Sequence, residues 1–250
     1  MEWGDFMHTD NNENYFVWLF NQLKGWPVQN YMLWFFAFGF QLALLIQQKM
    51  TAVTIITFIG TLLGTLCVLA TKAINGWLGL ISAACFIYAG LEAKNYLSIF
   101  EQIAYIATLD LPVILSVKSW NDDTKNHLRK FGAKEWVIAI VGTLAVYAVS
   151  GYLIGKFTND PRPWIDAISF AISLTAGIMC FMRYNNQYFW WTASGIFQLI
   201  LWGVTYAEGD ATLAMAVNSL IYVINDVLAF TVSPWFNMGR RREGLKEIKN

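Results

Sequence analysis

A stripe of aromatic and polar side chains follows one side of residues 186–206, a segment long enough to cross a bilayer. Its members recur at spacings of three, four, three and four residues, so on a helix they share one face. They are Tyr188, Trp191, Gly195, Gln198 and Trp202. Aromatic faces stack on flat rings, and an amide can both donate and accept hydrogen bonds. The stripe therefore predicts a groove for a flat polar ligand rather than for a lipid tail.

The composition excludes an ordinary soluble domain. Hydrophobic residues make up 56% of the 250 positions, charged residues make up 14%, and the mean hydropathy is +0.42. The formal net charge is zero, whereas a nucleic-acid binder needs surplus Lys and Arg to displace counterions from phosphates. We therefore expect an all-α integral membrane protein that contacts the lipid bilayer and no nucleic acid.

Motifs for metals and cofactors are missing from the sequence. The three cysteines, Cys67, Cys85 and Cys180, fall in apolar segments, where reduced thiols pack as small apolar side chains. His8 and His127 have no Cys or His neighbour at ligand spacing. The chain also has no Walker A loop. We therefore predict no metal, no cofactor and no enzymatic activity.

Apolar stretches of membrane-spanning length recur eight times along the chain. Each is expected to be an α-helix, because a lone helix satisfies its own backbone hydrogen bonds in lipid. Their cores are residues 31–46, 52–69, 74–91, 96–117, 136–154, 164–182, 187–206 and 211–232. A shorter aromatic segment, residues 15–23, is expected to lie at the membrane interface.

The distribution of Lys and Arg predicts the orientation of these spans. If the chain crosses the membrane eight times, 13 of the 17 basic residues fall on the side of the two termini. The other side holds Lys49, Lys94, Lys156 and Arg162. By the positive-inside rule, both termini are expected in the cytoplasm.

The stripe has a partial copy earlier in the chain. A shift of 114 residues places Trp77 on Trp191 and Tyr88 on Trp202. This predicts that Trp77 and Tyr88 line the same ligand groove from a second helix. Duplicated helices of this kind are common in transporters.

The next segment is also duplicated, at a shift of 117 residues. It has a polar, an aromatic and a polar position on one helical face in both copies. The two faces are Glu101, Tyr105 and Thr108, and Asn218, Tyr222 and Asn225. The copies pair spans two to four with spans six to eight, and the single span between them makes the two repeats parallel.

The predicted organisation is therefore one extra helix followed by a 3+1+3 core. The expected parts are the N-terminal tail, interfacial segment and extra helix (1–50), the first repeat (51–117), a charged loop and linker helix (118–160), the second repeat (161–233) and a basic cytoplasmic tail (234–250).

Over residues 52–235 the chain resembles the PnuC family of bacterial nicotinamide riboside transporters. The resemblance rests on the sequences NGWLGLIS (75–82), YAGLEAKNY (88–96) and RYNNQYFWW (183–191). It implies a SWEET-like 3+1+3 fold, a homotrimer in the bacterial inner membrane, and import by facilitated diffusion. It also implies a functional link to a cytosolic kinase, which traps the substrate by phosphorylation.

The substrate motif of that family has the form W-x-x-W-x-x-x-N. The matching positions here are Tyr188, Trp191 and Gly195. Trp191 keeps the base-stacking position, Tyr188 is a second aromatic, and the amide is absent. Either Gln198 supplies the missing amide one turn along, or Gly195 leaves room for a bulkier base.

The expected pocket takes its side chains from both repeats. Tyr188, Trp191 and Trp202 are assigned to the base, Gln198, Asn218 and Asn225 to its polar edges, Glu101 to ribose hydroxyls, and Tyr105 and Tyr222 to the sides. For some of these residues a second interpretation stands. Tyr188 and Trp202 are also typical of an interfacial aromatic belt, and the two asparagines of helix–helix hydrogen bonds. Asp110 and Asp226 are candidates for gating or structural roles.

The predicted function is import of a nucleoside-type precursor. Nicotinamide riboside is the leading substrate, followed by deoxynucleosides and then thiamine. A membrane-embedded enzyme would need clustered acids or a metal motif at the membrane surface, and Asp122, Asp123 and His127 do not supply one.

Overall fold

The computed structural model describes residues 15–26, 28–70, 74–115, 129–184 and 186–232. The predicted N-terminal tail up to residue 14, most of the charged loop and the basic tail from residue 234 lie outside the described residues. The described chain is all-helical apart from short connections. This agrees with the all-α prediction.

Each predicted span coincides with helical structure. A short α1 (Tyr15–Asn21) covers the predicted interfacial segment. The long helices are α2 (Val28–Gln47), α3 (Ala52–Ala70), α4 (Asn75–Glu92), α8 (Ala133–Phe157), α9 (Pro163–Phe181), α10 (Gln187–Ala207) and α11 (Leu213–Val232). Between α4 and α8, helical structure runs through α5 (Tyr96–Tyr105), η2 (Ile106–Asp110) and α6 (Leu111–Leu115).

Polarity is distributed as lipid requires, with polar side chains inside and apolar ones outside. Small hydroxyl residues such as Thr61, Ser169 and Ser173 are fully buried, whereas large apolar residues such as Phe36 and Val141 are exposed. In a soluble protein the preference is the reverse. The exposed apolar surface therefore suits hydrocarbon, and the buried hydroxyls suit helix–helix contacts within a membrane.

Within the described residues, five helices are long and apolar enough to cross a membrane. They are Val28–Gln47, Ala52–Leu69, Tyr96–Leu115, Ala133–Phe157 and Pro163–Phe181. Of the remaining long helices, α4 and α10 are less apolar, and both carry polar side chains that line the interior. The stretch Leu213–Leu228 of α11 is apolar but shorter than these spans.

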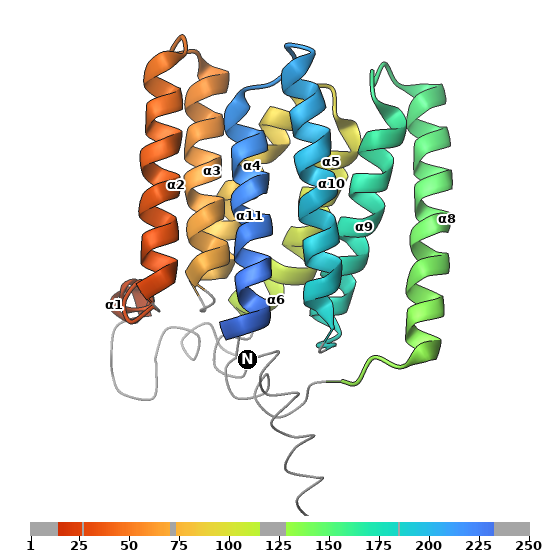
Figure 1. Cartoon of the computed structure of the whole chain (residues 1–250), viewed down its shortest axis with the longest axis horizontal. Helices are drawn as coiled ribbons and strands as arrows, with labels where there is room; N and C mark the ends of the chain where they lie inside the picture. The colour runs from red at the N-terminus through yellow and green to blue at the C-terminus, as the bar shows by residue number, and fades with distance from the viewer. Residues whose placement is uncertain (1–14, 27, 71–73, 116–128, 185, 233–250) are drawn as a thin grey trace, which may run out of the picture.

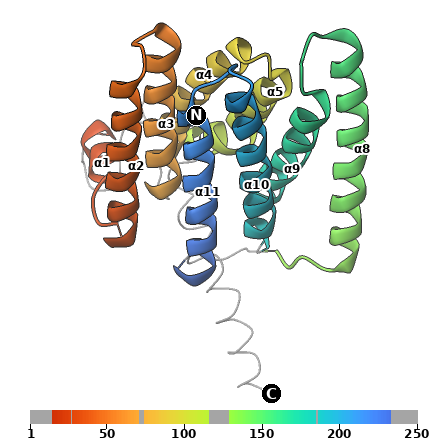
Figure 2. The same ribbon diagram turned by 45° about the horizontal axis from the view of Figure 1, so that its top comes forward.

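Six of these segments form a ring. Around it, each contacts the next in the order α3, α4, α5, α9, α10, α11 and back to α3. Figures 1 and 2 show α2 outside this ring against α3, and α8 outside it against α9. The ring brings together residues that lie more than a hundred positions apart in the sequence.

A wide π-helical turn, η2, interrupts the segment that was predicted as one uninterrupted span over residues 96–117. Pro112 follows it and lacks the backbone N–H that an α-helix needs, so the preceding turn widens. The turn places the Asp110 side chain where a Cβ on Gly79 would stand. A side chain at position 79 would therefore displace this carboxyl group.

The connections between the helices lie at two opposite ends of the bundle. Figure 1 shows α1 and the end of α11 at the lower end, which we call the α1 end. The connections α4–α5, α8–α9 and α10–α11 lie together at the upper end, which we call the Arg162 end. Arg162 is 4% exposed and joins these three connections.

Candidate functional site

A cavity of about 360 Å³ lies inside the helical ring. Small-molecule sites typically enclose roughly 300 to 1,000 Å³. All six ring segments and α2 supply side chains to its wall. The lining reaches the first turns of α4 and α10 at the α1 end, where it includes Asn75 and Gln187. Towards the Arg162 end the last lining residues are Phe86, Ser98, Trp202 and Met215.

The charged side chains that line the cavity are all acidic. Glu101, Asp110 and Asp226 are lining residues, and the described lining contains no Lys, Arg or His. Ionisable side chains within a membrane are costly and usually mark a pathway for a substrate or ion. The cavity is therefore suited to a cationic or neutral solute.

A chain of hydrogen bonds crosses the middle of the cavity wall. Gln198 Nε2 on α10 donates to the Glu101 carboxylate on α5. The Trp202 indole N–H donates to Gln198 Oε1 at 2.9 Å. The hydroxyls of Tyr105 and Ser173 interact with the same carboxylate. Glu101 is thereby held by side chains from α5, α9 and α10.

Aromatic side chains form one wall next to this carboxylate. The rings of Tyr105 and Trp191 have centroids 5.6 Å apart and are tilted by 49°. The Trp191 indole N–H is directed to Gln187 Oε1 at 3.4 Å, and Tyr188 also lines the cavity. A flat ring can stack on this wall while its polar edges meet Glu101.

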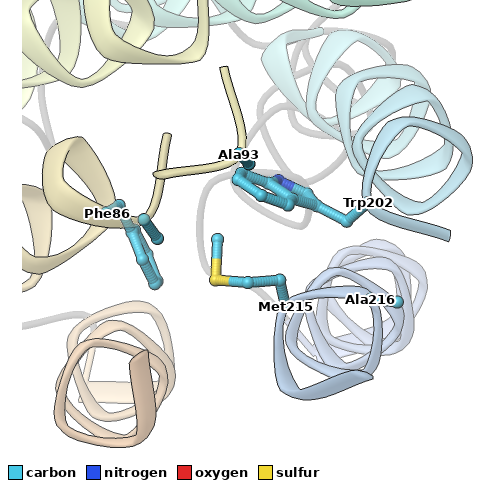
Figure 3. Packing of buried hydrophobic residues seen from close by; sticks show 6 residues of the cluster. Phe86, Ala93, Trp202, Met215 and Ala216 are labelled. Carbon is cyan, nitrogen blue, oxygen red and sulfur yellow. The ribbon is translucent and has the colours of Figure 1, made fainter. Parts of the chain in front are cut away.

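Trp202 lies at the edge of the cavity and is only 3% exposed. It belongs to a buried cluster with Phe86, Ala93, Met215 and others. Figure 3 shows the side chains of Phe86, Met215 and Trp202 pointing toward one another from three helices. Since its N–H is held by Gln198 and its ring is packed by apolar neighbours, Trp202 seals the cavity at the Arg162 end.

Three comparisons relate this chain to known proteins. The profile of the family described as "Nicotinamide mononucleotide transporter" matches residues 51–237, which is well over half of the chain. This chain belongs to the nicotinamide mononucleotide transporter family. The curated nicotinamide riboside transporter PnuC of Neisseria mucosa is 21% identical over 195 residues, which cover 72% of each chain.

The fold agrees with this membership in the family of membrane transporters. A crystal structure of the vitamin B3 transporter PnuC matches with a TM-score of 0.72 and 18% identity, over 90% of this chain and 98% of that one. The predicted resemblance to the PnuC family is confirmed.

Within this family fold, Gly195 is a packing position as well as a lining residue. A Cβ at Gly195 would stand 2.8 Å from Val223 Cγ2 on α11. An asparagine there would collide with α11. Close packing of α10 on α11 is thus one reason why position 195 carries no side chain, and whether Gly195 also leaves room for a bulkier base stays a prediction.

Ten of the twelve predicted site residues line the cavity. They are Glu101, Tyr105, Tyr188, Trp191, Gly195, Gln198, Trp202, Asn218, Tyr222 and Asn225. Asn218 also bonds a neighbouring helix, since its Oδ1 accepts from Thr65 Oγ1 at 3.0 Å. Their roles toward a substrate remain predictions.

The structure places Trp77 and Tyr88 outside the cavity lining, unlike the prediction. Trp77 is 39% exposed and Tyr88 is half-buried. The lining residues of α4 include Asn75, Gly79 and Phe86. Residues two positions away on a helix point roughly 200° apart, so Trp77 and Tyr88 belong to the opposite face of α4.

The duplication has a different register in this helix pair. The three helices of the first triplet begin at residues 52, 75 and 96, and those of the second at 163, 187 and 213. The offsets are therefore 111, 112 and 117 residues. An offset of 112 places the lining residues Gly79, Ser82 and Ala83 on Trp191, Ser194 and Gly195. The predicted shift of 117 for the third pair agrees with the helix starts, whereas the shift of 114 is wrong.

Sequence reasoning missed several lining residues. They include Asn30, Cys67, Asn75, Ser82, Gln102, Gln187 and Ser194. Gln187 and Ser194 could have been found, because they lie four residues before and three after Trp191 and so share its face. The small residues of α4 carry no aromatic signal, and only the fold reveals that they face the stripe.

Proposed function

We propose that this transporter imports nicotinamide riboside by facilitated diffusion, and that a cytosolic kinase traps the product. The observation that supports it is the pairing of an aromatic wall at Trp191 with an acid-lined cavity that lacks basic side chains. Nicotinamide riboside has a flat pyridinium cation and a hydroxylated sugar. Its ring gains both stacking and cation–π attraction on an indole face, while Glu101 attracts the charge.

The same observation argues against a phosphorylated substrate, despite the mononucleotide in the family's description. Phosphate sites are usually built from Arg, Lys or helix N-termini. The first turns of α4 and α10 reach the cavity, but its described lining offers no basic side chain, and Glu101, Asp110 and Asp226 would repel a phosphate. The nucleoside is therefore the better substrate than its phosphate ester.

Thiamine is the second candidate, because its thiazolium ring is also a flat cation. Neutral deoxynucleosides can stack on Trp191 but gain no charge–charge attraction from the acidic residues. The charges of the cavity thus rank thiamine above deoxynucleosides, the reverse of the order from the sequence alone.

The proposed architecture is eight membrane spans with a 3+1+3 core of parallel repeats. The order of contacts in the ring supports it. If α3, α4 and α5 are exchanged with α9, α10 and α11, every contact of the ring is mapped onto another contact of the ring. A two-fold axis along the membrane normal has this property. Likeness to the family supports a homotrimer in the bacterial inner membrane.

The proposed orientation places the α1 end in the cytoplasm. Among the described residues, Lys24, Arg129, Lys130, Lys134 and Arg183 lie at this end. If the chain crosses the membrane eight times, the sequence assigns 13 of the 17 basic residues to the same side. The Arg162 end then faces the periplasm.

Binding to the purified protein tests the proposed substrate. Calorimetry or thermal-shift titration would compare nicotinamide riboside with its 5′-phosphate, its neutral reduced form, thiamine and deoxyadenosine. We expect nicotinamide riboside to bind most tightly and the phosphate at least about tenfold more weakly, since a like charge near three acids costs free energy. Tighter binding of the phosphate would overturn the proposal.

A further inference from the structure

The Arg162 end is closed by two stacked layers of side chains. The inner layer is the apolar cluster of Phe86, Met215 and Trp202, at which the cavity lining stops. The outer layer is the set of polar contacts made by Arg162. Ala93 belongs to both layers, because its side chain packs in the cluster and its carbonyl oxygen accepts from Arg162 Nη2 at 2.8 Å.

The outer layer joins the two triplets. Arg162 Nε and Nη2 donate to Asn95 Oδ1 at 3.2 and 3.1 Å, in the α4–α5 connection of the first triplet. Arg162 Nη1 pairs with Glu208 and, at 2.9 Å, with Asp210, in the α10–α11 connection of the second triplet. The arginine side chain is 2% exposed, while each acidic partner is 47% exposed. Arg162 itself stands at the start of the second triplet, so the two halves can separate at this end only after it releases Asn95 and the Ala93 carbonyl oxygen. Glu208 and Asp210 hold its guanidinium in position for those contacts.

The inner layer is connected to the centre of the cavity. Gln198 accepts from the Trp202 indole N–H and donates to Glu101. One amide thus holds the sealing tryptophan and the acidic residue expected to meet a cationic substrate. A cation that binds the Glu101 carboxylate competes with Gln198 Nε2 for it, which frees the Gln198 amide to turn and weakens its hold on Trp202.

We propose that Arg162 with Glu208 and Asp210, stacked on Trp202, forms the outer gate of the transporter, and that Gln198 couples this gate to ligand binding at Glu101. The proposal rests on the proposed function, because a carrier must open each end of its cavity in turn. Without substrate, the contacts of Glu101, Gln198 and Trp202 keep the Arg162 end closed. When substrate binds Glu101, these contacts weaken and the Arg162 end can open, so a bound substrate can cross in either direction.

Thiol accessibility tests the gate without any substrate. The reporter is Ser219→Cys in a chain whose Cys67, Cys85 and Cys180 are replaced by alanine; Ser219 is a buried lining residue one turn below Met215. A membrane-impermeant cationic methanethiosulfonate is applied to right-side-out and to inside-out vesicles. In the otherwise unchanged reporter, labelling from the Arg162 side is expected to be slow.

Loss of either layer is expected to speed labelling from the Arg162 side. Arg162→Gln should raise this rate about tenfold or more, since removing a few strong contacts shifts a two-state equilibrium by at least that factor. Trp202→Phe keeps a ring in the cluster and removes only the N–H, so a rise of roughly threefold is expected. Matched controls are Lys156→Gln, an exposed cation at the same end, and Trp190→Phe, a buried tryptophan of α10 in another cluster. Both should leave the rate unchanged.

Two further variants test the gate and its coupling to the ligand. If Arg162→Gln does not accumulate in membranes, Glu208→Gln with Asp210→Asn removes the partners and should raise labelling in the same direction. In the reporter alone, nicotinamide riboside should accelerate labelling from the Arg162 side. When Gln198→Leu is added to the reporter, this labelling should be faster from the start and should no longer respond to nicotinamide riboside. Unchanged labelling in all gate variants would overturn the gate. If the gate variants respond but nicotinamide riboside binds nowhere, the proposed substrate fails and the gate stands.

Discussion

In the proposed 3+1+3 arrangement α4 and α10 occupy equivalent places, but they present different chemistry to the cavity. The lining of α10 is mostly large and polar or aromatic, with Gln187, Tyr188, Trp191, Gln198 and Trp202 beside the small Ser194 and Gly195. The lining of α4 is mostly small, with Asn75, Gly79, Ser82, Ala83 and Phe86. The duplicated scaffold thus carries an asymmetric site.

This asymmetry assigns a separate task to each helix. The side chains of α10 provide the surface on which a ring stacks, and the small residues of α4 leave the space that the ring fills. Two walls of bulky aromatics would fill the cavity themselves. In the ring, α5 adds Glu101, η2 adds Asp110 and α11 adds Asp226, so acids come from both proposed triplets while stacking comes from one.

The largest expected effect belongs to the stacking wall. Trp191→Leu keeps an apolar side chain and removes the ring, so affinity for nicotinamide riboside should fall about 10- to 100-fold, as expected for roughly 1 to 3 kcal/mol per stacked base. Trp190→Leu makes the same change at the neighbouring position, which packs against Trp136 away from the cavity. Titration of both purified variants checks this. Equal losses in the two variants would show that stacking is not specific to the cavity face of α10.

The acidic contribution is expected to be smaller and selective. Glu101→Gln preserves the shape of the side chain and a hydrogen-bond acceptor but removes the charge. Binding of cationic nicotinamide riboside should weaken about tenfold, because a charge in a poorly solvated site interacts strongly. Binding of its neutral reduced form should change by less than about twofold.

Competition between the two forms in one assay measures this selectivity directly. If both forms lose affinity equally, Glu101 acts through its hydrogen bonds with Gln198 and Tyr105 rather than through its charge.

The close contact of α10 with α11 predicts an effect on stability. Gly195→Asn restores the amide of the family motif, but its Cβ would meet Val223. Overpacking of this kind costs about 1 to 3 kcal/mol, so the melting temperature should fall by several degrees. Val223→Ala in the same chain should recover most of the loss. A stable single variant with tighter binding would instead make Gly195 a specificity position.

Much of the fold could be predicted from the sequence because lipid leaves few options for a long apolar segment. All eight predicted ranges coincide with helical structure, although Pro112 and the turn before it were not recognised as a π segment. The stripe on α10 was also found correctly, since spacings of three and four residues define a helical face without knowledge of neighbours.

The opposite wall could not be predicted in the same way. Gly79, Ser82 and Ala83 become part of the site only because the ring places them across from Trp191. Likewise, a chain of contacts such as Glu101, Gln198 and Trp202 depends on how α5 and α10 are packed. The alignment of Trp77 with Trp191 gave a shift between α4 and α10 that the cavity lining does not support. Tryptophan is also common on faces toward lipid or the membrane interface, so it does not identify the cavity face.

The smallest expected effect tests this correction of the register. Trp77 and Tyr88 were predicted as the counterparts of Trp191 and Trp202, but they lie off the cavity lining of α4. Trp77→Phe and Tyr88→Phe should therefore change affinity for nicotinamide riboside by less than about twofold, as surface substitutions usually do. Ala83→Phe, on the cavity face of the same helix, should in contrast weaken binding at least about tenfold by filling the space opposite the stacking wall. The three variants titrated together separate the two faces of α4, and a loss at Trp77 as large as that at Ala83 would return the site to a symmetric, doubly aromatic groove.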